Sequence, residues 1–205
     1  MILFSTNNSN ICTQLKVLIL LLVIFLGIFD CKKDSNIITN SQLSDSEYVL
    51  PYPIGEKYRC TQSFGGNISH QGVFYFSVDF DMPKGSIITA ARKGRVIFFQ
   101  ENFYDQDLGT EKSNVVIIQH EDSTYARYAH LTHNGALVEV GQEVETGHTL
   151  GFSGSSGSRG HYHLHFDVTK DCPQTNCQTI PFKFKNCSPD HYPLKSGVYY
   201  RAEEY

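Results

Sequence analysis

The sequence has no segment in which apolar residues recur with the 3.6-residue period of an amphipathic helix. Long helices are therefore not expected. It has no internal repeat, and its 17 Lys and Arg residues are scattered and outnumbered by 21 Asp and Glu residues, for a net charge of -4. Because a phosphate backbone requires a basic stripe, no nucleic-acid partner is expected. A chain of 205 residues, 40% of them hydrophobic, is enough for one ordinary core, which predicts a single folded domain.

One long apolar run, residues 17–29, lies near the N-terminus and is followed by Cys31 and a polar stretch. Its length is typical of a signal-peptide core rather than of a membrane-spanning helix. We therefore expect residues 1–31 to be a signal peptide with a lipidated Cys31, residues 32–50 to be a polar tether, and residues 51–205 to be the folded domain with a cysteine-containing C-terminal extension.

An uncleaved signal anchor is the alternative, because Phe29 and Asp30 occupy positions where small residues usually precede a lipidated cysteine. Both interpretations place the domain outside the cytoplasm. They predict a cell-envelope protein that is anchored to a membrane on its periplasmic or extracellular face.

Four cysteines lie beyond the predicted leader, namely Cys60, Cys172, Cys177 and Cys187. An even set in an exported protein tends to form disulfides. Three pairings are possible and the sequence does not select among them; the preferred one joins Cys172 to Cys177 and Cys60 to Cys187. A structural zinc knuckle that adds His191 to the last three cysteines is the alternative, and export makes it the weaker one.

Short β-branched and aromatic runs, punctuated by Gly and Pro, predict an all-β fold. The tight Gly turns between them suit a small, strongly bent antiparallel sheet or a barrel-like sandwich. The continuous apolar run at residues 115–118 is typical of a central strand. In residues 74–81, the alternation places Phe74, Phe76, Val78 and Phe80 on the core face and Asp79 on the opposite face.

A second alternating segment, residues 161–168, carries ligand-type side chains. Its expected core face holds Tyr162, Leu164, Phe166 and Val168. Its opposite face holds His161, His163, His165 and Asp167. A catalytic zinc site needs three protein ligands from His, Asp, Glu or Cys and leaves a fourth position to water. Two histidines at i and i+2 could place one imidazole on the metal and the other beside that water.

Several segments, in this order, resemble the M23 family of peptidoglycan endopeptidases. They are Ser69-His70-Gln71-Gly72, then Val78-Asp79-Phe80-Asp81, then Tyr128-Ala129-His130-Leu131, and finally His163-Leu164-His165-Phe166. The resemblance covers roughly residues 63–168. It implies an all-β fold of the LytM type, a barrel-sandwich hybrid, with Zn²⁺ as cofactor and peptidoglycan peptide as substrate.

Carried over by position, the resemblance implies His70, Asp79 and His165 as zinc ligands and His130 and His163 as catalytic histidines that are not ligands. One departure concerns spacing, because many family members place the first His and the Asp four residues apart, whereas nine positions separate His70 from Asp79. A hairpin-like detour through Gly72 and Val73 is expected to bring both to one metal.

Two functions follow from this pattern. The first is a zinc metalloendopeptidase that hydrolyses peptide cross-links or bridges of peptidoglycan. The alternative is a catalytically silent LytM-like module that binds peptidoglycan or activates another cell-wall hydrolase. Silent modules typically lose metal-binding residues, whereas this sequence keeps the whole set. Four further histidines are expected to have no part in the site, namely His120, His133, His148 and His191.

Overall fold

The computed structural model describes residues 47–158 and 161–205. The predicted signal peptide, Cys31 and nearly all of the predicted tether lie outside these residues. The folded part begins earlier than predicted, because β1 (Glu47–Tyr48) pairs in parallel with β12 (Lys183–Phe184). Tyr48, Val49 and Leu50 are buried. These apolar side chains belong to the core, so the tether boundary at residue 50 was wrong.

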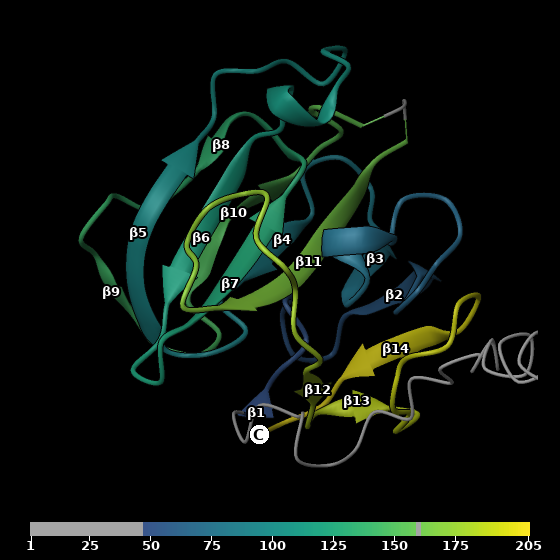
Figure 1. Ribbon diagram of the computed structural model, residues 1–205. Coiled ribbons are helices and arrows are strands. Elements are labelled where there is room, and N and C mark those ends of the chain that lie inside the picture. The colour runs from purple at the N-terminus through teal and green to yellow at the C-terminus, as the bar shows by residue number, and fades with distance from the viewer. Residues whose placement is uncertain (1–46, 159–160) are drawn as a thin grey trace, which may run out of the picture. The chain divides into compact units, whose positions relative to one another are not determined.

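The domain is all-β, as predicted, and its largest element is an open nine-stranded sheet (Figure 1). The strands lie in the order β13 (Cys187–Ser188), β14 (Tyr199–Ala202), β2 (Lys57–Gln62), β3 (Ser77–Asp81), β11 (His163–Lys170), β7 (Thr124–Ala129), β6 (Val115–Gln119), β5 (Gly94–Gln100) and β9 (Glu143–Val144). Its neighbouring strands are antiparallel, and its two edge strands do not pair with each other. The apolar run at residues 115–118 forms β6, an interior strand, as expected.

A three-stranded antiparallel sheet packs with the large sheet around one core. It consists of β4 (Ile87–Thr89), β10 (Thr149–Ser153) and β8 (Leu131–Ala136). The shared core joins side chains of both sheets, among them Ile88, Leu150, Tyr128 and Phe166, each 0% exposed. Burial of such side chains stabilises the fold by roughly 1.5–3 kcal/mol each. The two sheets therefore form a sandwich rather than a closed barrel.

Helical structure in the described residues is limited to two short 3₁₀ turns, η2 (Gly72–Phe74) and η3 (Thr110–Lys112). None of the helical segments in this part of the chain has the length and apolar character needed to cross a membrane.

Two predicted strands start later than the sequence pattern suggested. Residues 74–76 do not extend β3, because Gly72 adopts a positive φ of 58° and opens η2 instead. Tyr162 precedes β11 and is 39% exposed rather than buried. The core positions within the two observed strands are buried as predicted: Val78, Phe80, Leu164, Phe166 and Val168.

The disulfide prediction was half right. Cys172 and Cys177 are bonded, with Cα atoms 5.9 Å apart, whereas Cys60 and Cys187 are free and buried. Cys60 lies on β2 and Cys187 on β13, and β14 runs between these strands. Two strand spacings amount to about 9.5 Å, beyond the Cα separation that a disulfide spans. The predicted Cys60–Cys187 bond is therefore incompatible with the sheet order.

Candidate metal centre and active site

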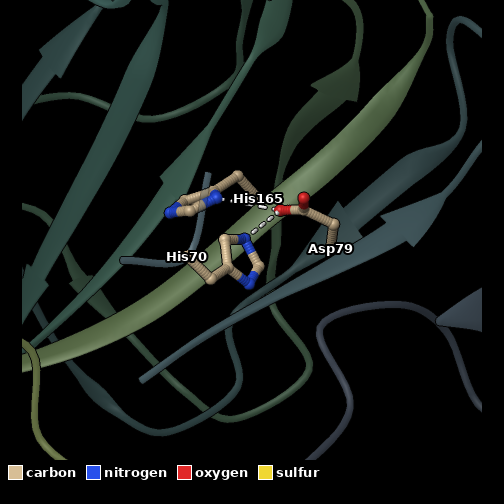
Figure 2. Close-up of side chains that lie close together, drawn as sticks. All are labelled: His70, Asp79 and His165. Atoms are coloured by element: carbon tan, nitrogen blue, oxygen red, sulfur yellow. Dashed lines mark hydrogen bonds and ion pairs between the residues drawn. The ribbon is translucent and has the colours of Figure 1, made fainter. Parts of the chain in front are cut away.

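Asp79 and His165 face each other across β3 and β11, where they are register partners. Their side chains share the face of the sheet that points away from the core, and His165 Nδ1 lies 2.8 Å from Asp79 Oδ1. His70 reaches the same oxygen from the loop before η2, with Nε2 at 3.0 Å (Figure 2). One candidate ligand atom from each residue lies within 4.8 Å of the others. Two imidazoles and one carboxylate thus converge on one point.

The segment between His70 and Asp79 explains how their unusual spacing is accommodated. Gly72 turns the chain into η2, and the amide of Tyr75 donates to the Gly72 carbonyl. The Tyr75 carbonyl then accepts a hydrogen bond from the Gly65 amide, at 2.8 Å. The intervening residues fold into a compact detour, so that His70 lies beside β3 despite the longer connection.

Each of the three side chains is held by a polar partner on its far side. His70 Nδ1 lies 3.0 Å from the Ser63 carbonyl, which can only accept, so Nδ1 carries the proton. Gln62 Nε2 donates to Asp79 Oδ2 at 2.8 Å. His165 Nε2 lies 2.9 Å from Asp167 Oδ2. Such partners fix the orientation and tautomer of metal-ligating side chains.

The charges in this cluster depend on one another. Burial would raise the pKa of Asp79, but the neighbouring imidazoles of His165 and His70 outweigh it and hold the pKa of this carboxyl well below its usual range. Burial would likewise lower the pKa of His165, yet Asp167 and Asp79 outweigh it and raise that pKa to about 9. The two carboxylates therefore favour positive charge at this point of the site.

The Nε2 atom of His70 faces a carboxylate oxygen without a proton to share with it. His70 is 0% exposed, its proton lies on Nδ1, and its Nε2 atom is 3.0 Å from Asp79 Oδ1 but makes no hydrogen bond. Buried polar atoms are normally satisfied. An imidazole nitrogen with a free lone pair, facing a carboxylate and a second imidazole, matches the donor set of a catalytic zinc site. The residues present therefore fit this metal.

His130 and His163 lie next to the cluster, with ring centroids 4.6 Å apart; the His130 centroid is 5.9 Å from that of His165. His130 Nδ1 lies 2.7 Å from the Ser156 carbonyl, and His163 Nδ1 lies 3.1 Å from the His161 carbonyl. Because a carbonyl only accepts, Nδ1 carries the proton in both rings and Nε2 keeps its lone pair.

Both rings are held in the neutral form. Burial, reinforced by the neighbouring His163 and His165, lowers the pKa of His130 to about 3. Burial is also the main cause that lowers the pKa of His163. His130 joins β7 to β8 with a positive φ of 67°, which for a residue with a side chain costs roughly 1–2 kcal/mol. Such strained positions cluster at functional sites.

The supporting residues could not be identified from the sequence. Gln62, Ser63 and Ser156 lie in segments without ligand-type patterns and act through single atoms. Asp167 was visible only as the last member of the histidine row on β11. Arg127, which contacts Asp167, gave no signal except its place in the strand before His130.

His161 stacks on His163, with ring centroids 4.3 Å apart, and is exposed. An open groove of about 570 Å³ adjoins this position. The residues that line this groove include His161, Asp81, Lys57 on β2 and Tyr199 on β14. Asp81 is the register partner of His163. The C-terminal extension therefore contributes to the surface beside the site.

Two curated proteins are similar to this chain in sequence. An uncharacterised metalloprotease of Buchnera aphidicola is 28% identical over 130 residues, which are 62% of this chain and 32% of that protein. The peptidoglycan DD-endopeptidase ShyA of Vibrio cholerae is 30% identical over 121 residues, 57% of this chain and 26% of that protein. The chain thus spans about a third or less of the length of these curated relatives.

A solved structure has the same fold. The catalytic domain of EnpA, a prophage-encoded M23 protein from Enterococcus faecalis, superposes with a TM-score of 0.51 at 25% identity and covers 64% of this chain and 93% of that domain. The model of peptidase family M23 matches residues 73–177, just over half of the chain. His70 lies just outside that match and Asp79, His130, His163 and His165 lie within it. On this match, the chain belongs to peptidase family M23.

Proposed function

We propose that this protein is a zinc metalloendopeptidase that hydrolyses peptide cross-links or bridges of peptidoglycan. The observation that carries the proposal is the convergence of His70, Asp79 and His165, with a buried Nε2 atom that lacks a hydrogen bond. Membership of a peptidase family and similarity to a peptidoglycan DD-endopeptidase support the substrate.

In this proposal, His70 Nε2, a carboxylate oxygen of Asp79 and His165 Nδ1 would hold the zinc ion. Bound zinc would supply Lewis-acid polarisation of the scissile carbonyl and activation of water. Ser63, Gln62 and Asp167 orient the three ligands from behind.

His130 and His163 move the protons. Each ring donates Nδ1–H to a backbone carbonyl and keeps a lone pair on Nε2. The Nε2 atom of one of the two rings takes one proton from the attacking water as a general base. The resulting N–H then donates to the developing oxyanion or passes the proton to the leaving amine. The groove beside His163 gives room for the peptide on one side of the scissile bond.

We further propose that the domain works in the cell envelope, with Cys31 or the apolar run at residues 17–29 as its membrane anchor. An enzyme anchored to a membrane stays close to a polymeric substrate in the envelope.

The decisive experiment incubates purified peptidoglycan with the zinc-loaded protein and identifies released fragments by mass spectrometry. Peptide fragments that appear with zinc, vanish with a chelator and return when zinc is restored are the expected result. A matched Asp79→Asn variant, nearly the same shape but without the carboxylate, should release none. Zinc binding without any released fragment, together with retention on peptidoglycan, would establish the silent binding module instead.

A further inference from the structure

The side of His165 that faces away from the ligand cluster is bound to a buried carboxylate. His165 Nε2 lies 2.9 Å from Asp167 Oδ2, and Asp167 is 0% exposed. The two residues are neighbours on the same face of β11. An acceptor at Nε2 fixes the proton there, which leaves the Nδ1 lone pair for the point where Asp79 and His70 meet.

A buried carboxylate needs a compensating charge, and Arg127 provides it. Arg127 lies opposite Asp167 in the register of β7 and β11. Its Nε donates to Asp167 Oδ2 at 3.1 Å, and Nη2 contacts the same oxygen. The guanidinium lies over the Phe74 ring, 5.0 Å from its centroid. Asp167 is therefore held in place by a cation that is itself packed.

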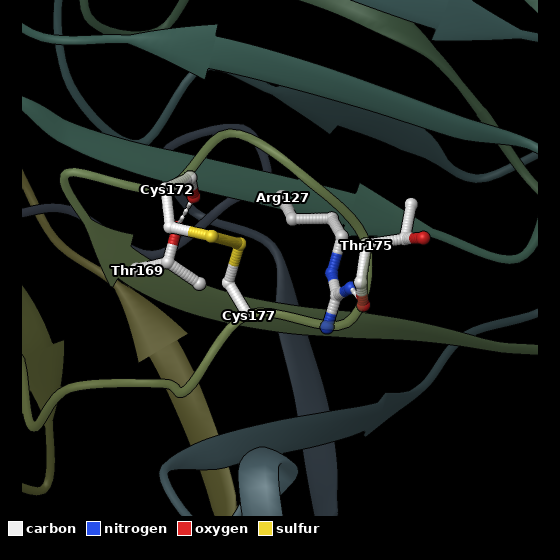
Figure 3. Close-up of a disulfide and its surroundings, with 5 residues drawn as sticks. All are labelled: Arg127, Thr169, Cys172, Thr175 and Cys177. Carbon is white, nitrogen blue, oxygen red and sulfur yellow. Dashed lines mark hydrogen bonds between the residues drawn. A yellow bond between two sulfur atoms is a disulfide. The ribbon is translucent and has the colours of Figure 1, made fainter.

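The third nitrogen of this guanidinium is bound by a disulfide-closed loop. Arg127 Nη1 donates to the Thr175 carbonyl, and Thr175 lies between Cys172 and Cys177 (Figure 3). Thr169 Oγ1 on β11 donates to the Cys172 carbonyl at 2.6 Å, which ties the loop to the strand that carries His165. The disulfide restricts the conformations that Thr175 can adopt. The loop thus forms one wall of the arginine site.

We propose that Asp167 and Arg127 are positioning residues of the metal centre, and that the Cys172–Cys177 loop holds Arg127 in the position that this role requires. The inference rests on the proposed metal centre. The three parts act in series: the loop fixes the guanidinium, the guanidinium fixes the carboxylate, and the carboxylate fixes the tautomer and the ring of His165. Loss of a partner behind a metal ligand typically weakens metal affinity about 10–100-fold.

An arrangement in series predicts how substitutions combine. Asp167→Ala should weaken zinc affinity about 10–100-fold, and Arg127→Ala should do so by a similar or smaller factor. The double variant should be no weaker than Asp167→Ala alone, because Arg127 acts only through Asp167. Replacing both Cys172 and Cys177 by Ser should weaken affinity less, and should add nothing once Arg127 is Ala.

The measurement is a zinc competition titration against a chromophoric chelator, on metal-free protein whose unfolding free energy is determined separately. Cobalt-substituted protein gives a second readout, because a displaced His165 alters the visible ligand-field spectrum. If Asp167→Ala does not fold, Asp167→Asn replaces it in the titration, because the Asn side-chain oxygen can occupy the place of Oδ2 without its charge. Arg92→Ala is the control, because it removes a different arginine–aspartate pair, with Asp122 at 2.9 Å, and should leave zinc affinity unchanged.

The outcomes separate this inference from the proposed function. Unchanged zinc affinity and cobalt spectrum in the Asp167 and Arg127 variants, with lower unfolding free energy alone, would reduce the network to a structural role and overturn the inference. Independent, additive losses would overturn the order in series. A wild-type protein that binds no zinc would instead contradict the proposed function.

Discussion

The rings of His130 and His163 lie 4.6 Å apart, and each directs its Nδ1 atom to a backbone carbonyl. The substitution His130→Asn should therefore distinguish the role of Nδ1 from the role of Nε2 in that ring. The amide can still donate to the Ser156 carbonyl, and Asn tolerates the positive φ of this position. The base at Nε2 is lost, so peptidoglycan hydrolysis should fall about 100-fold or more. Bound zinc, measured by elemental analysis, should stay near one per chain.

His133→Asn is the matched control, because His133 lies three residues further along, against Tyr104. It should hydrolyse peptidoglycan like the wild type. Loss of zinc in His130→Asn would show that His130 holds the metal rather than a proton.

His120 should make the fold sensitive to acid. Burial lowers the pKa of His120 to about 4; its ring packs against Tyr48, with Arg92 and Asp122 nearby. Because this pKa lies below the unfolded value of about 6.5, the unfolded state takes up the proton first, and stability is lost as pH falls from about 6.5 towards 4. Between pH 7 and 5, His120 should lower the unfolding free energy by about 2 kcal/mol.

The variant that tests this contribution is His120→Asn, whose amide can still donate to the Lys93 carbonyl, 2.8 Å from His120 Nδ1 in the wild type. Urea titrations of both proteins at pH 7 and pH 5 should show a smaller loss in the variant. If both proteins lose the same unfolding free energy between pH 7 and pH 5, His120 is not the cause of the acid sensitivity.

Phe182 should make the C-terminal extension indispensable to the domain. It is 2% exposed and contacts the rings of Tyr48, Phe64, Phe166 and Phe184. Phe182→Ala should lower the unfolding free energy by about 3–5 kcal/mol, through lost burial and the cavity that remains. Phe98→Ala, at a site 42% exposed, should change it by no more than about 0.5 kcal/mol. If Phe182→Ala lowers the unfolding free energy as little as Phe98→Ala does, the C-terminal extension is not part of the core.

Non-reducing peptide mapping should find Cys172 joined to Cys177, with Cys60 and Cys187 unpaired. Burial raises the pKa of Cys60 to about 12 and is the main cause that raises that of Cys187, so neither thiol should react with alkylating reagents before unfolding. Mass spectrometry after alkylation in the native and the denatured state measures both. A Cys60–Cys187 peptide would contradict the strand order of the sheet.

Tyr199 should contribute to substrate binding but not to chemistry. Tyr199 is 53% exposed and lines the groove, and Lys57 Nζ lies 5.5 Å from the centroid of its ring. Tyr199→Ala should raise KM for a peptidoglycan-derived peptide several-fold, roughly the factor given by one lost aromatic contact, and leave kcat unchanged. Tyr199→Phe should behave like the wild type. A fall in kcat alone would refute this role.

The sequence predicted the faces of the central strands better than their ends. Alternation placed Leu164 and Phe166 in the core and His165 opposite, because a strand inverts successive side chains. The prediction from alternation failed at Phe74, because Gly72 adopts a positive φ and begins a 3₁₀ turn there. It failed also at Tyr162, which has no strand partner to set its direction.

Contacts that depend on strand register or strand order were beyond sequence reasoning. The pairing of Arg127 with Asp167 depends on the register of β7 and β11, which no local pattern encodes. The Cys60–Cys187 bond looked attractive only because the sequence does not reveal that β14 separates the two strands. The nine-residue interval before Asp79 became intelligible once the detour through η2 was visible.

The position of β14 beside β2 has a consequence for how the molecule is made. Tyr52 donates to the Tyr200 carbonyl across 148 positions of the chain, and His70 meets a partner that is synthesised long after it. Closing such long loops precedes any gain from the contacts, so folding should be slow for the size of the domain. A nascent chain that has not yet extended to β11 has no complete donor set. Under the proposed function, metal binding is therefore a late event that requires synthesis of the chain beyond that strand.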